Sequence, residues 1–304
     1  MIWLISASIG CCSLILLRLL LQKRISLRGK TILITGASSG LGEALARRLF
    51  EYECTLVLIA RRIDRLQTLS DELIRKHPTY PKPKLIELDL SNIEQIPLSI
   101  SLRNVLLMNP IDCLINNAGL SQRSSVLSTP MDIVQDIFRV NYLSVVQLTQ
   151  LVLKQMIDLQ RSNASIVNIS SMQGLIAVPD RSSYSASKHA VQAFSDSLRM
   201  ELKEEHEKLN INVCVVSPSY IRTELGQQAL NRLNQIGQSE QKNSSAAYEP
   251  DDVAQRIIRA IEYRQTEVII APFVQHIAIW LRRYFPSFYY RLMVARNKRL
   301  KAQN

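Results

Sequence analysis

Short runs of apolar and β-branched residues recur between residues 30 and 271, and longer stretches with helically spaced apolar positions separate them. Such runs are typical of buried strands, and segments of roughly 20 to 50 residues between them have room for a helical crossover. Right-handed crossovers join parallel strands, so the pattern predicts one doubly wound α/β domain with a parallel sheet of about seven strands. The predicted strands are residues 30–35, 55–60, 84–88, 111–115, 164–169, 211–216 and 267–271.

A glycine-rich turn, G-A-S-S-G-L-G, follows the first predicted strand and precedes a helical pattern over residues 43–50. In that order, backbone N–H groups and a helix N-terminus are presented to a diphosphate, although the spacing differs from the G-x-G-x-x-G form. A tight turn without a ligand is the alternative. The pattern predicts a nucleotide site whose contacts come from Gly36, Ser38, Ser39, Gly40, Leu41 and Gly42.

Two arginines, Arg61 and Arg62, directly follow the second predicted strand. An acidic residue there would bind the ribose hydroxyls of NAD, whereas arginine suits the 2′-phosphate of NADP(H). The first acid is Asp64, so the sequence favours NADP(H), with Arg61 as the main phosphate ligand and Arg62 as a weaker candidate. The alternative is that both are solvated charges at the start of a helix.

A tyrosine and a lysine, Tyr184 and Lys188, lie four residues apart in a helical pattern over residues 183–208. That spacing places both side chains on one helix face. A cation so close is expected to hold the pKa of the phenol below its usual value of about 10, so that it can exchange a proton with an alkoxide near neutral pH. The pair therefore predicts carbonyl–alcohol chemistry, and a surface tyrosine at a helix start is the alternative.

In combination, the T-G-x3-G-x-G turn, N-N-A-G at residues 116–119 and Ser171 with Tyr-x3-Lys resemble the short-chain dehydrogenase/reductase family over about residues 28–272. The resemblance implies a Rossmann-like fold and an oxidoreductase. It also implies that Tyr184 is the general acid/base and that Lys188 lowers its pKa and hydrogen-bonds the nicotinamide ribose. Ser171, 13 residues before the tyrosine, would hold the substrate oxygen.

Further roles come from the same resemblance. Asn141, in R-V-N-Y, matches a residue that relays protons through a water, with a polar helix residue bonded to backbone as the alternative. Asp89 would contact the adenine and Thr223 the carboxamide. The remaining cofactor contacts are expected from Asn117, Ala118, Gly119, Pro218 and Ile221.

One residue departs from the family pattern. Ser219 follows Pro218 where the family commonly has glycine. Because serine tolerates a positive φ poorly, the loop that holds Ile221 and Thr223 is expected to follow a different path.

The net charge of +11 is concentrated at the two ends of the chain. Residues 1–30 contain five basic side chains and residues 280–304 contain seven, without an acid in either segment, which leaves 25 basic against 26 acidic residues between them. A nearly neutral domain has no long-range field for phosphate backbones, so nucleic acid is not an expected partner. The cysteines show no spacing typical of a metal site, and no metal is expected.

The first 17 residues contain no charge, and the apolar pattern continues to Leu21. About 20 such residues can cross a bilayer, which predicts a single-pass transmembrane anchor over residues 1–22. The alternative, a cleaved signal peptide, would begin with basic residues. The basic residues that follow place the catalytic domain in the cytosol by the positive-inside rule, with the lumen as the alternative. The expected location is the endoplasmic reticulum membrane, with the peroxisomal membrane as a second choice.

The C-terminal segment, residues 273–304, alternates aromatic and basic side chains. This composition suits a lipid headgroup interface, and a tail that packs a homodimer is the alternative. Together with the anchor, it resembles the membrane-associated dehydrogenase/reductases of the member 7B type.

These observations predict an NADP(H)-dependent reductase of a lipophilic ketone or aldehyde that acts at a membrane. Oxidation of a steroid or retinoid alcohol is the alternative reaction. A nucleotide-binding scaffold without turnover is the alternative from another class, although such a protein would be expected to have lost Tyr184 or Lys188, and both are present.

Overall fold

The computed structural model describes residues 24–227 and 247–302. The predicted anchor, residues 1–22, lies outside these ranges. Among the described helices, none has the length and apolar character needed to cross a bilayer.

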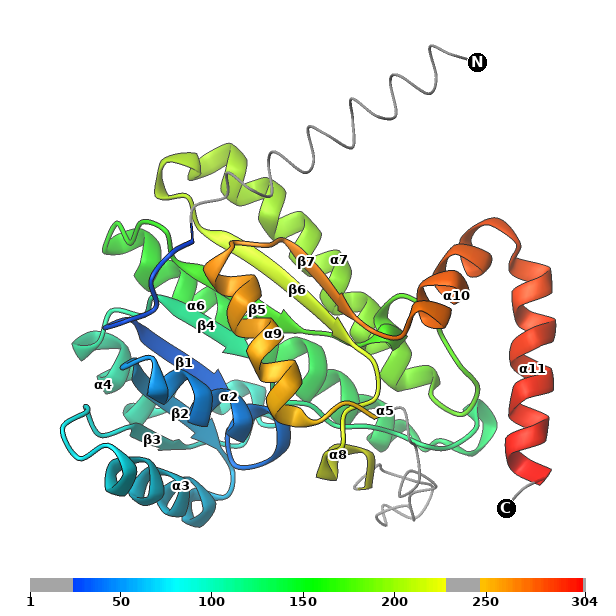
Figure 1. The fold of residues 1–304 in the computed structure, drawn as a ribbon, viewed down its shortest axis with the longest axis horizontal. Helices are drawn as coiled ribbons and strands as arrows, with labels where there is room; N and C mark the ends of the chain where they lie inside the picture. The colour runs from blue at the N-terminus through cyan, green and yellow to red at the C-terminus, as the bar shows by residue number, and fades with distance from the viewer. Residues whose placement is uncertain (1–23, 228–246, 303–304) are drawn as a thin grey trace.

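Seven parallel strands form one sheet in the order β3-β2-β1-β4-β5-β6-β7 (Figure 1). The chain starts in the middle of the sheet, builds outward to β3 and then crosses back to build the other half, which is the doubly wound topology that the sequence predicts. The four central strands are almost completely buried, as expected of strands covered on both faces. The strands are β1 (Thr31–Thr35), β2 (Thr55–Ala60), β3 (Lys84–Glu87), β4 (Cys113–Asn116), β5 (Ser165–Ile169), β6 (Asn212–Pro218) and β7 (Glu267–Ile270).

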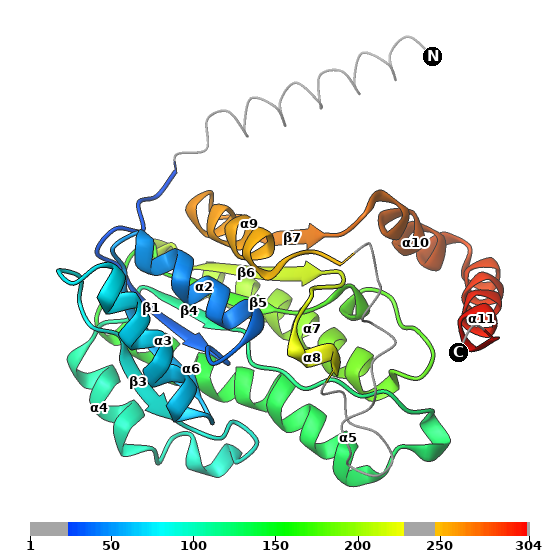
Figure 2. The ribbon, with the colours of Figure 1, turned by 60° about the horizontal axis from the view of Figure 1, so that its bottom comes forward.

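One face of the sheet is covered by α2 (Gly40–Glu51), α3 (Ile63–Lys76) and α9 (Pro250–Glu262) (Figure 2). The helices α2 and α9 pack against each other, and the buried Leu45 and Ile257 belong to the same apolar core. Helix α2 begins three residues earlier than its apolar pattern suggests, because Gly40, Leu41 and Gly42 form its first turn.

The other face is covered by α4 (Ile100–Met108), α6 (Ser144–Asp158) and α7 (Ser182–Glu205), while α5 (Met131–Phe138) packs beside α7. Helix α7 ends three residues before the predicted end at residue 208, and a 3-10 turn follows it. A π-helical turn, Arg139–Leu143, joins α5 to α6. Short 3-10 helices span Ile93–Gln95, Val126–Ser128, Met172–Gly174 and Glu207–Leu209, and α8 spans Glu224–Gln227.

Two helices, α10 (Phe273–Tyr284) and α11 (Pro286–Ala302), follow the last strand and project from one side of the domain (Figure 1). Tyr289 of α11 is 1% exposed, packs with Met172 and Ile176, and donates a hydrogen bond from its hydroxyl to the Ala177 carbonyl at 3.0 Å. Most other aromatic residues of the two helices are exposed. Tyr289 therefore attaches the C-terminal helices to the segment that follows β5.

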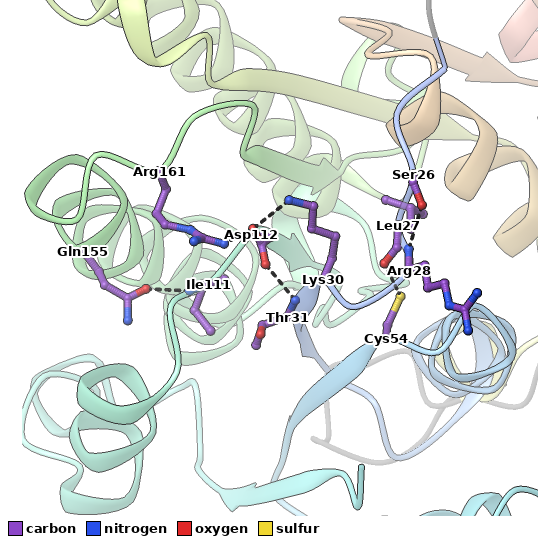
Figure 3. A network of polar contacts seen from close by, with 10 residues as sticks. All are labelled: Ser26, Leu27, Arg28, Lys30, Thr31, Cys54, Ile111, Asp112, Gln155 and Arg161. Atoms are coloured by element: carbon purple, nitrogen blue, oxygen red, sulfur yellow. Dashed lines mark hydrogen bonds and ion pairs between the residues drawn. The ribbon is translucent and has the colours of Figure 1, made fainter. Parts of the chain in front are cut away.

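The amino ends of the strands are held together by a polar network around Asp112, which precedes β4 (Figure 3). Its carboxylate accepts hydrogen bonds from the Thr31 backbone at 2.9 Å and from the Lys30 ammonium at 3.2 Å, and it is paired with Arg161. Asp112 is 8% exposed, so three donors compensate for the cost of burying its charge. This edge of the sheet is structural, and the predicted site residues lie at the opposite edge.

Candidate active site

The carboxyl ends of the strands bring together the sequence-predicted catalytic residues. Ser171 follows β5, and Tyr184 and Lys188 lie in the first two turns of α7, which packs against the short helix after Ser171. The side chains of Tyr184 and Lys188 are 7% and 4% exposed. The structure therefore brings these three residues together, with Tyr184 and Lys188 buried and Ser171 partly exposed.

Lys188 is held by the end of the neighbouring strand. Its ammonium donates to the Ile169 carbonyl at 2.8 Å and lies 5.9 Å from the centre of the Tyr184 ring. Burial lowers the pKa of Lys188 to about 8. The side chain is thus a cation at neutral pH that is close to losing its proton.

The predicted direction of the tyrosine pKa shift is wrong for this arrangement. Burial raises the pKa of Tyr184, and hydrogen bonding with the Ser171 side chain and the nearby charge of Arg181 lower it by less. The Lys188 ammonium is directed to a backbone carbonyl rather than to the phenol oxygen, so the loss of hydration decides the direction. The phenol consequently stays protonated at neutral pH.

Two adjacent serines at the end of β5 have different surroundings. The Ser170 hydroxyl is buried and donates to the Lys188 carbonyl at 3.1 Å. Ser171 is partly exposed, accepts a hydrogen bond from the Gln173 backbone at 3.1 Å and interacts with Tyr184. Only Ser171 of this pair therefore places a hydroxyl beside the phenol, and its role in holding the substrate oxygen stays a prediction.

Asn141 is fully buried within the π-helical turn. Its amide accepts from the Leu120 backbone at 2.7 Å, and it donates to the Leu120 carbonyl at 2.9 Å and to the Ser187 hydroxyl at 3.0 Å. A side chain on Gly119 would lie 3.4 Å from the Asn141 oxygen and 3.7 Å from the Lys188 ammonium. Asn141 therefore positions the segment after β4 beside Lys188, and its relay role stays a prediction.

The glycine turn is shaped for close approach of another group to the backbone. Gly36 has a φ of +66°, and a Cβ there would lie 2.9 Å from the Ala118 backbone. Gly40 has a φ of +58°, and its Cβ would lie 3.0 Å from Thr223. The N-cap of α2, Ser39, forms no side-chain cap, so the N–H groups of the first turn keep their capacity to bind an anion.

The end of β1 is joined to the end of β4 through Thr35, whose hydroxyl accepts from the backbones of Asn117 at 2.9 Å and Ala118 at 3.0 Å. The Asn117 side chain donates to the Thr35 carbonyl at 2.8 Å. The sequence predicts cofactor contacts for Asn117 and Ala118 but assigns no role to Thr35, which only begins the glycine-turn motif. A buried threonine at the end of a strand, directly before the first glycine, was the available signal.

The arginines after β2 differ in their contacts. Arg61 is exposed, whereas Arg62 donates to the Ser39 hydroxyl at 2.8 Å and to the Ser38 hydroxyl at 3.2 Å. Arg62 also pairs with Glu224 at 3.3 Å. The sequence favours Arg61 as the main phosphate ligand, but Arg62 is the arginine that contacts the glycine turn.

The remaining predicted contacts lie at the same edge of the sheet. Asp89 is exposed after β3, and its carboxylate accepts from the Ser91 backbone and hydroxyl, both at 2.9 Å. After Pro218, Ser219 does not adopt a positive φ and donates its N–H to the Ile270 carbonyl at 2.8 Å. The serine is thus accommodated without strain, and Thr223 still reaches the glycine turn.

Comparisons with known proteins agree with this arrangement. Residues 30–234 match the short chain dehydrogenase family. A dehydrogenase/reductase SDR family protein 7-like of Anopheles gambiae is 43% identical over 91% of this chain and 86% of that protein. The dehydrogenase/reductase SDR family member 7B of Xenopus laevis is 37% identical over 99% of this chain and 92% of that protein.

Solved structures give the same result for the fold. A short chain dehydrogenase/reductase from Burkholderia phymatum, in complex with NAD, has a TM-score of 0.73 at 22% identity, covering 87% of this chain and 96% of that one. A metagenomic short-chain oxidoreductase in complex with NADP has a TM-score of 0.64 at 26% identity, covering 82% and 99%. Structural relatives therefore include both NAD and NADP complexes.

The pKa of Lys188 makes the stability of the protein depend on pH. In the unfolded chain a lysine has a pKa of about 10.4, whereas burial holds it at about 8 in the folded protein. Between these values the unfolded chain binds more protons, so this lysine destabilises the fold below pH 8, and that penalty of roughly 3 kcal/mol disappears as the pH rises to 10.4. The substitution Lys188→Met should abolish this rise in the free energy of unfolding.

Chemical denaturation without added cofactor, between about pH 7 and pH 10.5, measures the effect. Lys154→Met is the control, because Lys154 is an exposed lysine paired with Asp158 at 3.0 Å, and it should keep the wild-type pH dependence. Equal pH dependences for Lys188→Met and the wild type would show that Lys188 titrates normally.

Proposed function

The chain belongs to the short-chain dehydrogenase/reductase family, and on that basis we propose that it uses NADP(H) to reduce a lipophilic ketone or aldehyde at a membrane. The observation that supports reduction is the buried Tyr184 phenol. A phenol has an ordinary pKa of about 10 and burial raises it, so Tyr184 is in the protonated form that a carbonyl reduction requires. Oxidation of an alcohol would need the phenolate instead, which this environment disfavours.

A dinucleotide fits the residues at the carboxyl edge. The glycines approach their neighbours too closely for side chains, and the uncapped first turn of α2 presents N–H groups to a diphosphate. When bound, the nicotinamide supplies the hydride for reduction. Gly119 and the Lys188 ammonium lie side by side, so that the backbone after β4 and a buried cation would hold the ribose end.

The residues of the chain supply the proton and the orientation. Ser171 and Tyr184 interact, so both hydroxyls can hydrogen-bond one carbonyl oxygen. Tyr184 gives its proton to that oxygen as negative charge develops on it. The Lys188 cation, 5.9 Å from the ring centre, then stabilises the phenolate that remains.

Two arginines after β2 support a preference for NADP(H). Arg61 occupies the position where an acid would select NAD, and Arg62 lies against the serine hydroxyls of the glycine turn. A 2′-phosphate between them would receive charge-assisted hydrogen bonds.

Action at a membrane is supported by the C-terminal helices. Their exposed side chains combine large apolar groups with arginines that lie over aromatic rings, such as Arg282 over Tyr290 at 5.6 Å. Such surfaces suit the headgroup region. The proposed site is the endoplasmic reticulum membrane, with the catalytic domain in the cytosol. The exposed aromatic residues include Phe273, Trp280, Tyr284, Phe285 and Phe288.

The acid role of Tyr184 is tested with the substitution Tyr184→Phe. Turnover of a panel of keto-lipids, sterones and retinals should fall by at least about 10²–10⁴-fold, because the carbonyl oxygen loses its proton donor. Cofactor binding, measured by NADPH fluorescence, should stay largely intact. Tyr263→Phe, which changes an exposed tyrosine at the C-terminal end of α9, is the control. Equal activity of Tyr184→Phe and the wild type would refute the assignment.

The cofactor preference is tested by replacing the arginines separately. Arg61→Ala and Arg62→Ala should each weaken NADPH binding by about 10- to 100-fold, because each removes charged donors from the phosphate. NADH binding should change little. Arg75→Ala, an arginine in the last turn of α3, serves as the control for net charge. An unchanged ratio of NADPH to NADH affinity would remove the substituted arginine from the phosphate site.

Membrane contact by the tail is tested with the fluorescence of Trp280. The chain has two tryptophans, so Trp3→Phe leaves Trp280 as the only one. In vesicles with anionic lipids, lipids brominated near the headgroup should quench Trp280, and Arg282→Gln with Arg283→Gln should reduce the quenching. A vesicle-bound protein without quenching would contradict tail docking.

The side of the membrane that holds the catalytic domain is tested by protease treatment of sealed microsomes. The protease should digest the domain if it is cytosolic, and protection of the domain would place it in the lumen.

A further inference from the structure

Two arginines, for which residues 24–227 and 247–302 contain no ion-pair partner, lie near the start of the helix that carries Tyr184. Arg123 belongs to the segment after β4, and Arg181 directly precedes α7. The Arg123 guanidinium donates to the Tyr220 hydroxyl at 3.3 Å, and Arg181 donates to the Ser121 hydroxyl at 3.0 Å. Tyr220 is also close enough to Arg181 to raise the pKa of that arginine. Within the described residues, neither arginine forms an ion pair with a carboxylate.

Buried donor atoms of this cluster lack hydrogen-bond acceptors. The Nε and Nη1 atoms of Arg123 are buried and have no hydrogen-bond partner in the described part of the chain. Burial lowers the pKa of Arg181, and the charge of Arg123 lowers it further. Two like charges with unused donors destabilise a fold unless a counter-charge joins them. Such an arrangement is typical of a site that receives an anion.

Three distant segments build this cluster, and one of them leads directly into the helix that carries Tyr184. The backbone of Ser124 donates to the Asp180 carbonyl at 3.1 Å, which joins the segment after β4 to the residue before Arg181. Asp180 has a φ of +63°, an uncommon conformation that turns the chain into α7. Arg181 is the N-cap residue of α7, three residues before Tyr184, and its charge lowers the pKa of that tyrosine, so this end of the cluster lies next to the reacting residue.

We propose that Arg123 and Arg181 bind an anionic group of the carbonyl substrate, preferably a phosphate monoester, with the Tyr220 hydroxyl between them. Two guanidiniums offer planar, paired donors, and a phosphate has three oxygens and nearly two charges to accept them. A carboxylate has the same chemistry with fewer acceptors. This inference rests on the proposed function, since it names the class of carbonyl compound that is reduced.

The first test compares alkyl ketones of equal chain length that end in a phosphate, a carboxylate or a hydroxyl. With the wild type, kcat/KM should be highest for the phosphate compound, by about 10- to 100-fold over the hydroxyl compound. Arg123→Gln and Arg181→Gln should each remove most of that advantage, mainly through KM, so that kcat/KM for the phosphate compound falls toward the value for the hydroxyl compound measured with the same variant. Arg123→Lys, which keeps the charge, should recover part of it.

A matched control distinguishes direct contact between the arginines and the anionic group from general electrostatic attraction by the net charge of the protein. Arg222 follows Tyr220 by two residues and is paired with Glu249 at 2.7 Å. Arg222→Gln therefore removes one positive charge, as Arg123→Gln does, from the segment that holds Tyr220. It should affect the three ketones alike. An equal loss for Arg222→Gln and Arg123→Gln on the phosphate compound would reduce the effect to net charge and overturn the site.

A binding measurement distinguishes failure of the anion site from failure of the proposed reduction. With saturating NADPH present, inorganic phosphate should raise the melting temperature of the wild type but not of Arg123→Gln. If phosphate stabilises only the wild type but no ketone is reduced, the anion site stands and the proposed function falls. If ketones are reduced with no preference for an anionic end and phosphate has no effect, the anion site is wrong and the reduction stands.

Discussion

The attachment of α7 to the end of β5 is the interaction on which the site depends. Lys188 forms both hydrogen bonds of this attachment. Its ammonium donates to the Ile169 carbonyl at 2.8 Å, and its backbone carbonyl accepts from the Ser170 hydroxyl at 3.1 Å. Gly174 lies so close to Ser170 and the Lys188 backbone that a side chain there would collide with them. Because the helix and the strand end are held in one register, Tyr184 faces Ser171. Burial of the ammonium is the cost of that register, and it is visible in a lysine pKa of about 8.

Polar groups have hydrogen-bond partners at the amino edge of the sheet, whereas several lack them at the carboxyl edge. At the amino edge, the buried Asp112 is satisfied by a backbone N–H and two basic side chains. At the carboxyl edge, the first turn of α2 lacks a side-chain cap, and Arg123 has buried donors without a partner. Polar groups that are left unsatisfied cost stability in the absence of ligands. We infer that the carboxyl edge is organised for phosphate-bearing molecules, while the amino edge stabilises the fold.

Sequence patterns predicted the sheet well because every strand is a short apolar run ended by a glycine, a polar residue or a proline. The seven strands lie within two residues of the predicted bounds, and their common edge follows from parallel pairing alone. The spacing of Tyr184, Lys188 and Ser171 likewise placed them together. Burial was harder to predict: the direction of the tyrosine pKa shift depends on which atom the ammonium contacts, and no spacing reveals that. The cluster of Arg123, Arg181 and Tyr220 was also missed, because its members come from three segments without a shared motif.

The central claim is that one buried phenol donates the proton while Ser171 and Lys188 hold the reacting groups around it. A crystal structure of the protein with NADP(H) and a slowly reduced ketone tests it most directly. We predict that the ketone oxygen lies within about 3 Å of the Tyr184 and Ser171 hydroxyls, with its carbonyl carbon about 3–3.5 Å from the nicotinamide. A ketone oxygen bound to other groups, with the Tyr184 hydroxyl directed away from the nicotinamide, would contradict the account.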